Sequence, residues 1–211
     1  MEIRYYGANC VKLSDKKIVL VIDDNLSQLG LKSVIKPQDV AIYTASHNES
    51  LVDAGRFLID GPGEYEISEV SIRGIAARAY TDETGLQATI YSIKIDDFNI
   101  GVIGHSNTDL NDEQLEAIGI VDVLIIPVGN HGYTLDANEA VGIIKKIEPK
   151  VVIPTHYADT AIKYAVPQVD LQPFLKALGI SEPETFEVLA LKERELGDKT
   201  RVVVLERSAI K

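Results

Sequence analysis

Four apolar segments of strand length, each followed by a histidine, most restrict the fold of this chain. In layered α/β proteins, the loops beyond strand ends carry ligands and catalytic groups, because a rigid sheet holds them in place. The pattern therefore predicts one shared pocket, and its alternative is four unrelated histidines. The apolar segments are 40–42, 100–104, 123–128 and 151–155, and the histidines, which are all that the sequence contains, are His47, His105, His131 and His156.

Length and composition favour one large domain. The chain has 211 residues, of which 45% are hydrophobic, and this is enough for a sizeable core. No linker, low-complexity run or repeat divides the sequence. We therefore expect a single domain over residues 1–211.

The charge and the apolar pattern restrict the class of partner. The net charge of -11 argues against nucleic acid or an anionic membrane, because phosphate binding needs clustered Lys and Arg. No apolar run approaches the roughly 18 residues that span a bilayer, and the N-terminus lacks a signal-peptide pattern. We expect a cytoplasmic protein with a small-molecule substrate of unknown identity, and a homo-oligomer stays open.

The single cysteine, Cys10, excludes an internal disulfide and a Cys-rich zinc site. It lies near a predicted strand, where free cysteines usually serve as small buried hydrophobes. We favour that role over a catalytic thiol.

The first half of the chain predicts mainly strands. The run 17–22 is apolar on both faces and is typical of a central strand. It ends at Asp23, whose carboxylate either favours a turn or faces the pocket. In the segment 57–67, the Pro62-Gly63 pair is typical of a type II turn and predicts a hairpin. Further strands are predicted at 3–6, 10–13, 40–42, 70–76, 88–95 and 100–104.

The second half alternates helices and strands. Asn111 is a candidate N-cap for a helix over 112–118, and a second helix over 136–147 has early acidic and late basic residues. A third helix is predicted over 170–178. Strands at 123–128, 151–155 and 200–206 complete the pattern. Two β-rich layers with helices outside, a four-layer αββα sandwich, fit this order.

Three segments carry a resemblance to a known family. They are Asp-Gly-Pro-Gly-Glu-Tyr-Glu at 60–66, the stretch 126–136 beginning Ile-Pro-Val-Gly, and Val-Val-Ile-Pro-Thr-His-Tyr at 151–157. The chain resembles the metallo-β-lactamase fold superfamily, in particular its small metal-dependent hydrolases, over most of residues 1–165. The resemblance implies the αββα fold and a hydrolase.

The first metal-binding loop departs from the family pattern. Members carry H-x-H-x-x-H or H-x-H-x-D-H after the strand, and here the three histidine positions hold Ala45, His47 and Ser50. Glu49 stands where many relatives have Asp. Two ligands of this loop are therefore missing.

The remaining metal positions are altered as well. The family histidine expected after 75–76 corresponds to Ala79 or a neighbour, and the Asp that bridges two zinc ions corresponds to His105. His156 and His47 are retained. A dinuclear centre needs roughly five to seven N and O ligands, so the standard two-zinc site cannot form here.

The resemblance leaves room for one ion. His47, His105 and His156 together would resemble a His₃ site for a single zinc, and Glu49 would act as a fourth ligand or as a general base. His131 would then lie at the rim of the pocket. We therefore predict a hydrolase with a remodelled, at most mononuclear, metal site.

Two alternatives stay open. A loop that lost two ligands fits a catalytically inactive, metal-free binding or assembly module, since the fold alone does not imply activity. A metal-free enzyme would use Ser46, Ser50 or Ser106 as nucleophile beside a histidine, although the chain has no G-x-S-x-G elbow.

Overall fold

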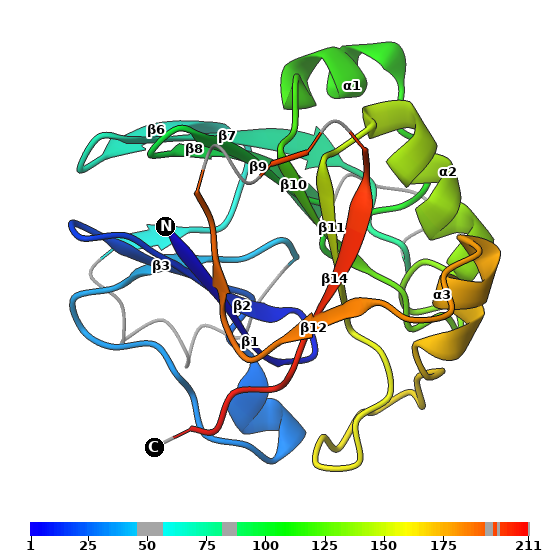
Figure 1. Ribbon diagram of the computed structural model, residues 1–211. Helices are drawn as coiled ribbons and strands as arrows, with labels where there is room; N and C mark the ends of the chain where they lie inside the picture. The colour runs from blue at the N-terminus through cyan, green and yellow to red at the C-terminus, as the bar shows by residue number, and fades with distance from the viewer. Residues whose placement is uncertain (46–56, 82–87, 193–195, 198, 211) are drawn as a thin grey trace.

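Two β-sheets packed face to face form the centre of the molecule (Figure 1). The computed structural model describes residues 1–45, 57–81, 88–192, 196–197 and 199–210. The first sheet has the order β13-β1-β2-β3-β4-β5 and the second the order β12-β14-β11-β10-β9-β8-β7-β6. The strands of the first sheet are β1 (Glu2–Gly7), β2 (Cys10–Ser14), β3 (Val19–Ile22), β4 (Val40–Ile42), β5 (Phe57–Ile59) and β13 (Leu189–Ala190).

The second sheet is mixed, with antiparallel strands at one side and parallel strands at the other. Its strands are β6 (Gly63–Ile67), β7 (Val70–Ala77), β8 (Ala88–Ile95), β9 (Phe98–Val102), β10 (Val123–Pro127), β11 (Val151–Thr155), β12 (Glu184–Phe186) and β14 (Arg201–Leu205). The predicted strands are found, whereas β12 and β13 had no clear sequence pattern.

Three α-helices cover the outer face of the second sheet: α1 (Asp112–Ile118), α2 (Ala137–Ile147) and α3 (Gln172–Ala177) (Figure 1). The N-cap predicted for α1 is confirmed, since Asn111 accepts from the Gln114 amide in a capping box. None of the described helices has the length and apolar character needed to cross a membrane.

The outer face of the first sheet has a thinner cover. Cys10 and Val21 pack there against Leu26 of the 3-10 helix η1 (Leu26–Leu29), together with the chain at 31–35. The layered α/β class with two central sheets is confirmed. In the described residues, the fourth layer is this short turn and irregular chain rather than a long helix.

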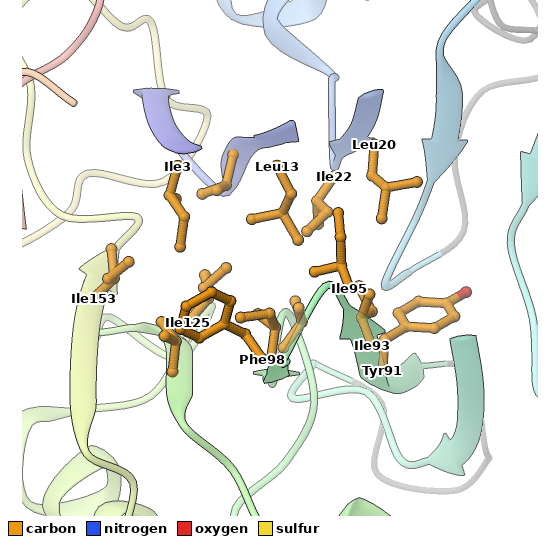
Figure 2. Close-up of a cluster of buried hydrophobic side chains, with 14 of the residues drawn as sticks. Ile3, Leu13, Leu20, Ile22, Tyr91, Ile93, Ile95, Phe98, Ile125 and Ile153 are labelled. Carbon is orange, nitrogen blue, oxygen red and sulfur yellow. The ribbon is translucent and has the colours of Figure 1, made fainter. Parts of the chain in front are cut away.

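Apolar side chains from both sheets meet in the central core. Figure 2 shows Ile3, Leu13 and Ile22 of the first sheet facing Ile93 and Ile125 of the second. Successive side chains of a strand point to opposite faces. The continuous apolar run of β10 is explained in this way, because alternate residues enter the central core and the core beneath the helices.

The hairpin prediction for 57–67 is wrong. β5 belongs to the first sheet and β6 to the second, so Gly61 and Pro62 carry the chain between the sheets. This link passes close to β7, because a Cβ at Gly74 would lie 2.5 Å from the Gly61 carbonyl oxygen. Proline followed by glycine indicates a change of direction and does not determine which strands pair.

The carboxyl ends of parallel strands from both sheets meet at one edge of the molecule. β3 and β4 are parallel in the first sheet, and β9, β10 and β11 are parallel in the second. The Thr89 amide of β8 donates to the Thr44 carbonyl oxygen just beyond β4, over 2.8 Å. This edge is the place where side chains from both sheets can form one site.

Candidate active site

The loops after β9 and β11 bring two histidines together. The ring centroids of His105 and His156 lie 5.3 Å apart with an interplanar angle of 83°, and both side chains are buried. β10 pairs with both strands in parallel, so these two loops leave the sheet at the same edge. The other predicted ligand, His47, and the predicted catalytic Glu49 fall within 46–56, outside the described residues.

The backbone at His105 is set by a close approach to the first sheet. Gly104 has φ of +58°, and a Cβ there would lie 2.2 Å from Cβ of Thr44. Glycine is therefore needed both for its conformation and for space. The His105 amide then donates to Thr44 Oγ1 over 3.4 Å.

Asp23 supplies a buried carboxylate from the first sheet. Its Oδ1 accepts from the Thr44 amide over 2.7 Å, and its Oδ2 accepts from Thr44 Oγ1 over 2.6 Å. The residue has φ of +48°, an unusual conformation for a side chain with a Cβ. Both roles considered from the sequence have support. Asp23 turns the chain, since the Asn25 amide donates to its carbonyl oxygen over 2.9 Å, and its carboxylate Oδ2 lies 4.0 Å from His105 Nδ1.

His105 is a neutral imidazole at neutral pH. Burial lowers its pKa to about 4, because desolvation disfavours the charged ring. The 4.0 Å separation from Asp23 would be an ion pair only for a protonated ring, so the neutral form makes it a polar contact. Asn9 Nδ2 approaches the ring, 3.3 Å from Nδ1 and 3.4 Å from Nε2. Asn9 is held in turn by Thr155, whose Oγ1 donates to Asn9 Oδ1 over 2.9 Å.

His156 is fixed on several sides. Its amide donates to the Ala8 carbonyl oxygen over 2.7 Å, and its φ is +53°. The ring packs on Tyr164 at a centroid distance of 5.1 Å, and Nδ1 lies 3.2 Å from Gln168 Oε1. Burial, and next the neighbouring His105, lower the pKa of His156 to about 3. Both imidazoles therefore carry a nitrogen lone pair at pH 7.

Tyr133, rather than His131, joins the two histidines. Its ring centroid lies 5.4 Å from His105 and 5.5 Å from His156. Asn130, His131 and Gly132 all have positive φ in the preceding turn, and His131 is exposed. Burial, and next the Asp23 carboxylate, raise the pKa of the Tyr133 hydroxyl, so it stays a neutral hydrogen-bonding group.

The described residues alone do not complete a metal site. Among them, no group of three or more His, Cys, Asp or Glu side chains could hold a metal ion. His105 and His156 have the chemistry of ligands, because neutral imidazole is the form that binds metals. They provide two donors, and the third predicted donor, His47, lies outside the described residues. Within the described residues, the donors are therefore two imidazoles, and an ion held here would need further donors from outside them.

In the described part of the chain, the serine and cysteine side chains considered as nucleophiles have no hydrogen-bonded base. Ser106 is buried, and its Oγ has no hydrogen-bond partner there. A serine nucleophile needs a base within hydrogen-bond reach. Ser46 and Ser50 lie outside the described residues. Cys10 is fully buried, and burial raises the pKa of its thiol well above the usual value, as expected for a packing residue.

Sequence reasoning missed four side chains of this site: Asn9, Thr44, Tyr133 and Gln168. Thr44 and Asn9 lie beside strand ends, so the same argument from strand position could have found them. Gln168 follows no apolar segment and comes from irregular chain, which leaves no pattern to detect. Tyr133 was hidden by the neighbouring His131, a more familiar ligand type.

Comparison with known proteins places this geometry in a family. Residues 2–156 match the β-lactamase superfamily domain. A relative from Aeropyrum pernix, named a UPF0173 metal-dependent hydrolase, is 22% identical over 79% of this chain and 86% of its own. A relative from Thermoplasma acidophilum with the same kind of name is 24% identical over 74% of this chain and 83% of its own.

Solved structures agree with this assignment. A Thermotoga maritima protein, described as a proposed Zn-dependent hydrolase of the metallo-β-lactamase superfamily, has a TM-score of 0.75 and 25% identity, with 97% of each chain covered. Igni18, a metallo hydrolase from Ignicoccus hospitalis, shares the fold at a TM-score of 0.60 and 19% identity, over 90% of this chain and 99% of its own. The chain therefore belongs to the β-lactamase superfamily domain family, and its two central sheets have the metallo-β-lactamase fold.

Proposed function

We propose that this protein is a metal-dependent hydrolase whose site holds at most one ion, with zinc as the metal and His47, His105 and His156 as its ligands. The observation that carries the proposal is the pair of buried, neutral imidazoles, 5.3 Å apart between ring centroids. Histidine at position 105 is a residue that commonly binds metal ions, whereas a site that had lost its metal could hold any residue at this position.

A bound ion of this kind supplies Lewis acidity and lowers the pKa of a water ligand toward neutrality. The protein's own groups complete the site. Asp23 and Asn9 border His105 with one acceptor and one donor, and the Tyr133 hydroxyl is available as a hydrogen-bond donor to substrate. Glu49 is proposed as the general base or fourth ligand, from its position in the family motif.

The substrate proposed is a small molecule. A net charge of -11 disfavours polyanions such as nucleic acid, since no clustered Lys and Arg offset it. The side chains that meet at the strand ends are neutral imidazoles, a buried carboxylate and a phenol rather than cations.

Zinc-dependent stabilisation tests the proposal. A ligand that binds only the folded state stabilises it by RT ln(1 + [L]/Kd), about 2.7 kcal/mol at a hundred times Kd. We expect zinc to raise the melting temperature of the wild type and of His131→Ala at pH 7.5. We expect a clearly smaller rise for His105→Ala. The measurement is a thermal-shift titration on protein purified without a histidine tag.

Two results would contradict the proposal. An equal zinc response in His105→Ala would mean that other residues bind the ion. No response in the wild type would favour the second candidate, a metal-free binding or assembly module. That candidate is supported by the first metal-binding loop, where Ala45 and Ser50 stand at two of the family's three histidine positions.

A further inference from the structure

Gln168 lies beyond the residues that match the family, and its carboxamide is buried against the site. It comes from the irregular chain between β11 and α3. Its Nε2 donates to the Val166 carbonyl oxygen over 2.7 Å. Its Oε1 lies 3.2 Å from His156 Nδ1 and 3.4 Å from Thr134 Oγ1. Both the nitrogen and the oxygen of the Gln168 side-chain amide therefore have hydrogen-bond partners.

These contacts fix which way the amide faces. A backbone carbonyl oxygen can only accept a hydrogen bond, so the group facing Val166 must be the amide NH₂. The oxygen of Gln168 then faces His156. Since Oε1 can only accept, His156 Nδ1 must carry the proton. In a neutral imidazole the other nitrogen, Nε2, is then the one with the lone pair.

The surrounding backbone is shaped to allow this contact. A Cβ at Gly129 would lie 2.1 Å from Gln168 Oε1 and 2.0 Å from the His156 carbonyl oxygen. Two backbone hydrogen bonds hold the segment that carries Gln168. The Val169 amide donates to the Gly129 carbonyl oxygen over 2.9 Å, and the Ala158 amide donates to the Val169 carbonyl oxygen over 2.8 Å. The Gln168 side chain and the His156 ring are thus held in place by three segments: the loop after β10, the loop after β11, and residues 166–169.

We propose that Gln168 is a positioning residue that holds His156 as the Nδ1–H tautomer and leaves Nε2 as its one basic nitrogen. Partners that orient a ligating histidine in this way commonly affect metal affinity. The consequence for zinc rests on the proposed function above. The tautomer itself is a property of the metal-free protein.

The tautomer can be observed directly. In ¹⁵N-labelled, metal-free protein at pH 7.5, protonated and unprotonated ring nitrogens resonate in separate ¹⁵N regions, and two-bond couplings to the ring protons assign Nδ1 and Nε2. We expect His156 of the wild type to show protonated Nδ1 and unprotonated Nε2. A wild-type spectrum with protonated Nε2 would overturn the proposal whatever the variants do.

Three variants separate positioning from general stability. Gln168→Met removes the acceptor at similar length, and we expect the Nδ1–H signature to be lost or mixed. Thr134→Val is the matched control, since it removes a buried hydroxyl that contacts Gln168 and leaves the His156 contact in place. Gln168→Glu keeps an oxygen acceptor for His156 Nδ1 and should keep Nδ1 protonated, although it loses the donor to the Val166 carbonyl oxygen. Retention of pure Nδ1–H in Gln168→Met would overturn the assignment.

Zinc affinity provides the second readout. We expect Gln168→Met to weaken zinc binding by about 10- to 100-fold, as for other residues that orient ligands, with Thr134→Val close to wild type. An equal loss in both variants would assign Gln168 a merely structural role. If the wild type binds no zinc, the proposed hydrolase fails, while the tautomer measurement still decides the role of Gln168.

Discussion

At the scale of single residues, His105 and His156 make the folded state sensitive to acid. Burial lowers their pKa values to about 4 and about 3, against about 6.5 for an exposed histidine. At a pH between the folded and the unfolded pKa of these histidines, the unfolded chain binds more protons than the folded one. The two histidines therefore make their full contribution to the free energy of unfolding above about pH 6.5. That contribution is lost as the pH falls toward their pKa values in the folded protein.

A pH series on the metal-free protein should show this effect. We expect the free energy of unfolding in urea to fall from pH 7 to pH 5, approaching about 1.4 kcal/mol per pH unit for each histidine. His156→Gln should reduce the slope, because it removes one of the two histidines with a lowered pKa. Equal slopes in the wild type and His156→Gln would show that His156 does not contribute to the acid sensitivity.

At the scale of elements, helix α2 depends on its N-terminal cap. Asp136 accepts from the amides of Asn138 and Glu139, and Glu139 reaches back to the Asp136 amide. The Glu139 carboxylate also accepts from the Tyr80 hydroxyl over 2.9 Å. The cap therefore joins the helix to the chain after β7 as well as satisfying its first turn.

Removing this cap should be measurable. We expect Asp136→Ala to lower the free energy of unfolding by about 1 kcal/mol, because two amides lose their acceptor. Asn138→Ala is the matched control, since it changes an exposed side chain in the same turn and should stay within about 0.5 kcal/mol. The measurement is urea denaturation of the three proteins. A cost for Asp136→Ala no larger than for the control would mean that tertiary packing alone holds this end of α2.

The sequence determined most elements because their signals are local. Asn111 could be recognised as a cap from a few neighbouring residues, and the strands from their apolar runs, whereas Asp136 was predicted as the first helical residue and is the cap of α2. The pairing of β5 and β6 could not, because turn chemistry at Pro62 does not determine the sheet that each strand joins. The short strands β12 and β13 have exposed or sparse apolar residues, so no periodic pattern indicated them.

The site was predicted only in part for a similar reason. His105 and His156 were found because each follows an apolar strand. Their partners are distant in sequence: Asn9 is 96 residues from His105 and 146 from Thr155. Such contacts depend on how the two sheets pack. No short segment encodes them.

At the scale of the whole molecule, Thr44 joins the two sheets at the edge that carries the site. Its carbonyl oxygen accepts from the Thr89 amide of the second sheet, and its own amide and hydroxyl donate to Asp23 of the first. The geometry of the site therefore depends on the sheets keeping their relative position.

Hydrogen exchange should report this connection. We expect the Thr89 amide to exchange only with global unfolding, so that its opening free energy equals the value from urea denaturation. The Lys17 amide, which donates to Asp15 in an exposed turn, serves as the locally opening control. Exchange of Thr89 as fast as that of Lys17 would show that the sheets separate at this edge while the rest stays folded.

The left-handed backbone at the strand ends has an energetic cost. Asp23 and His156 both have φ near +50°, as does Ala8, whose carbonyl oxygen holds His156. Each such conformation costs about 1 kcal/mol or more for a residue with a Cβ, and glycine would relieve it. These positions therefore give up some stability for a backbone path that places Asp23 and His156 at the same edge of the molecule. The same conformation at Ser68, Glu69, Asp96 and Glu148 lies away from this edge, where it serves only to turn the chain.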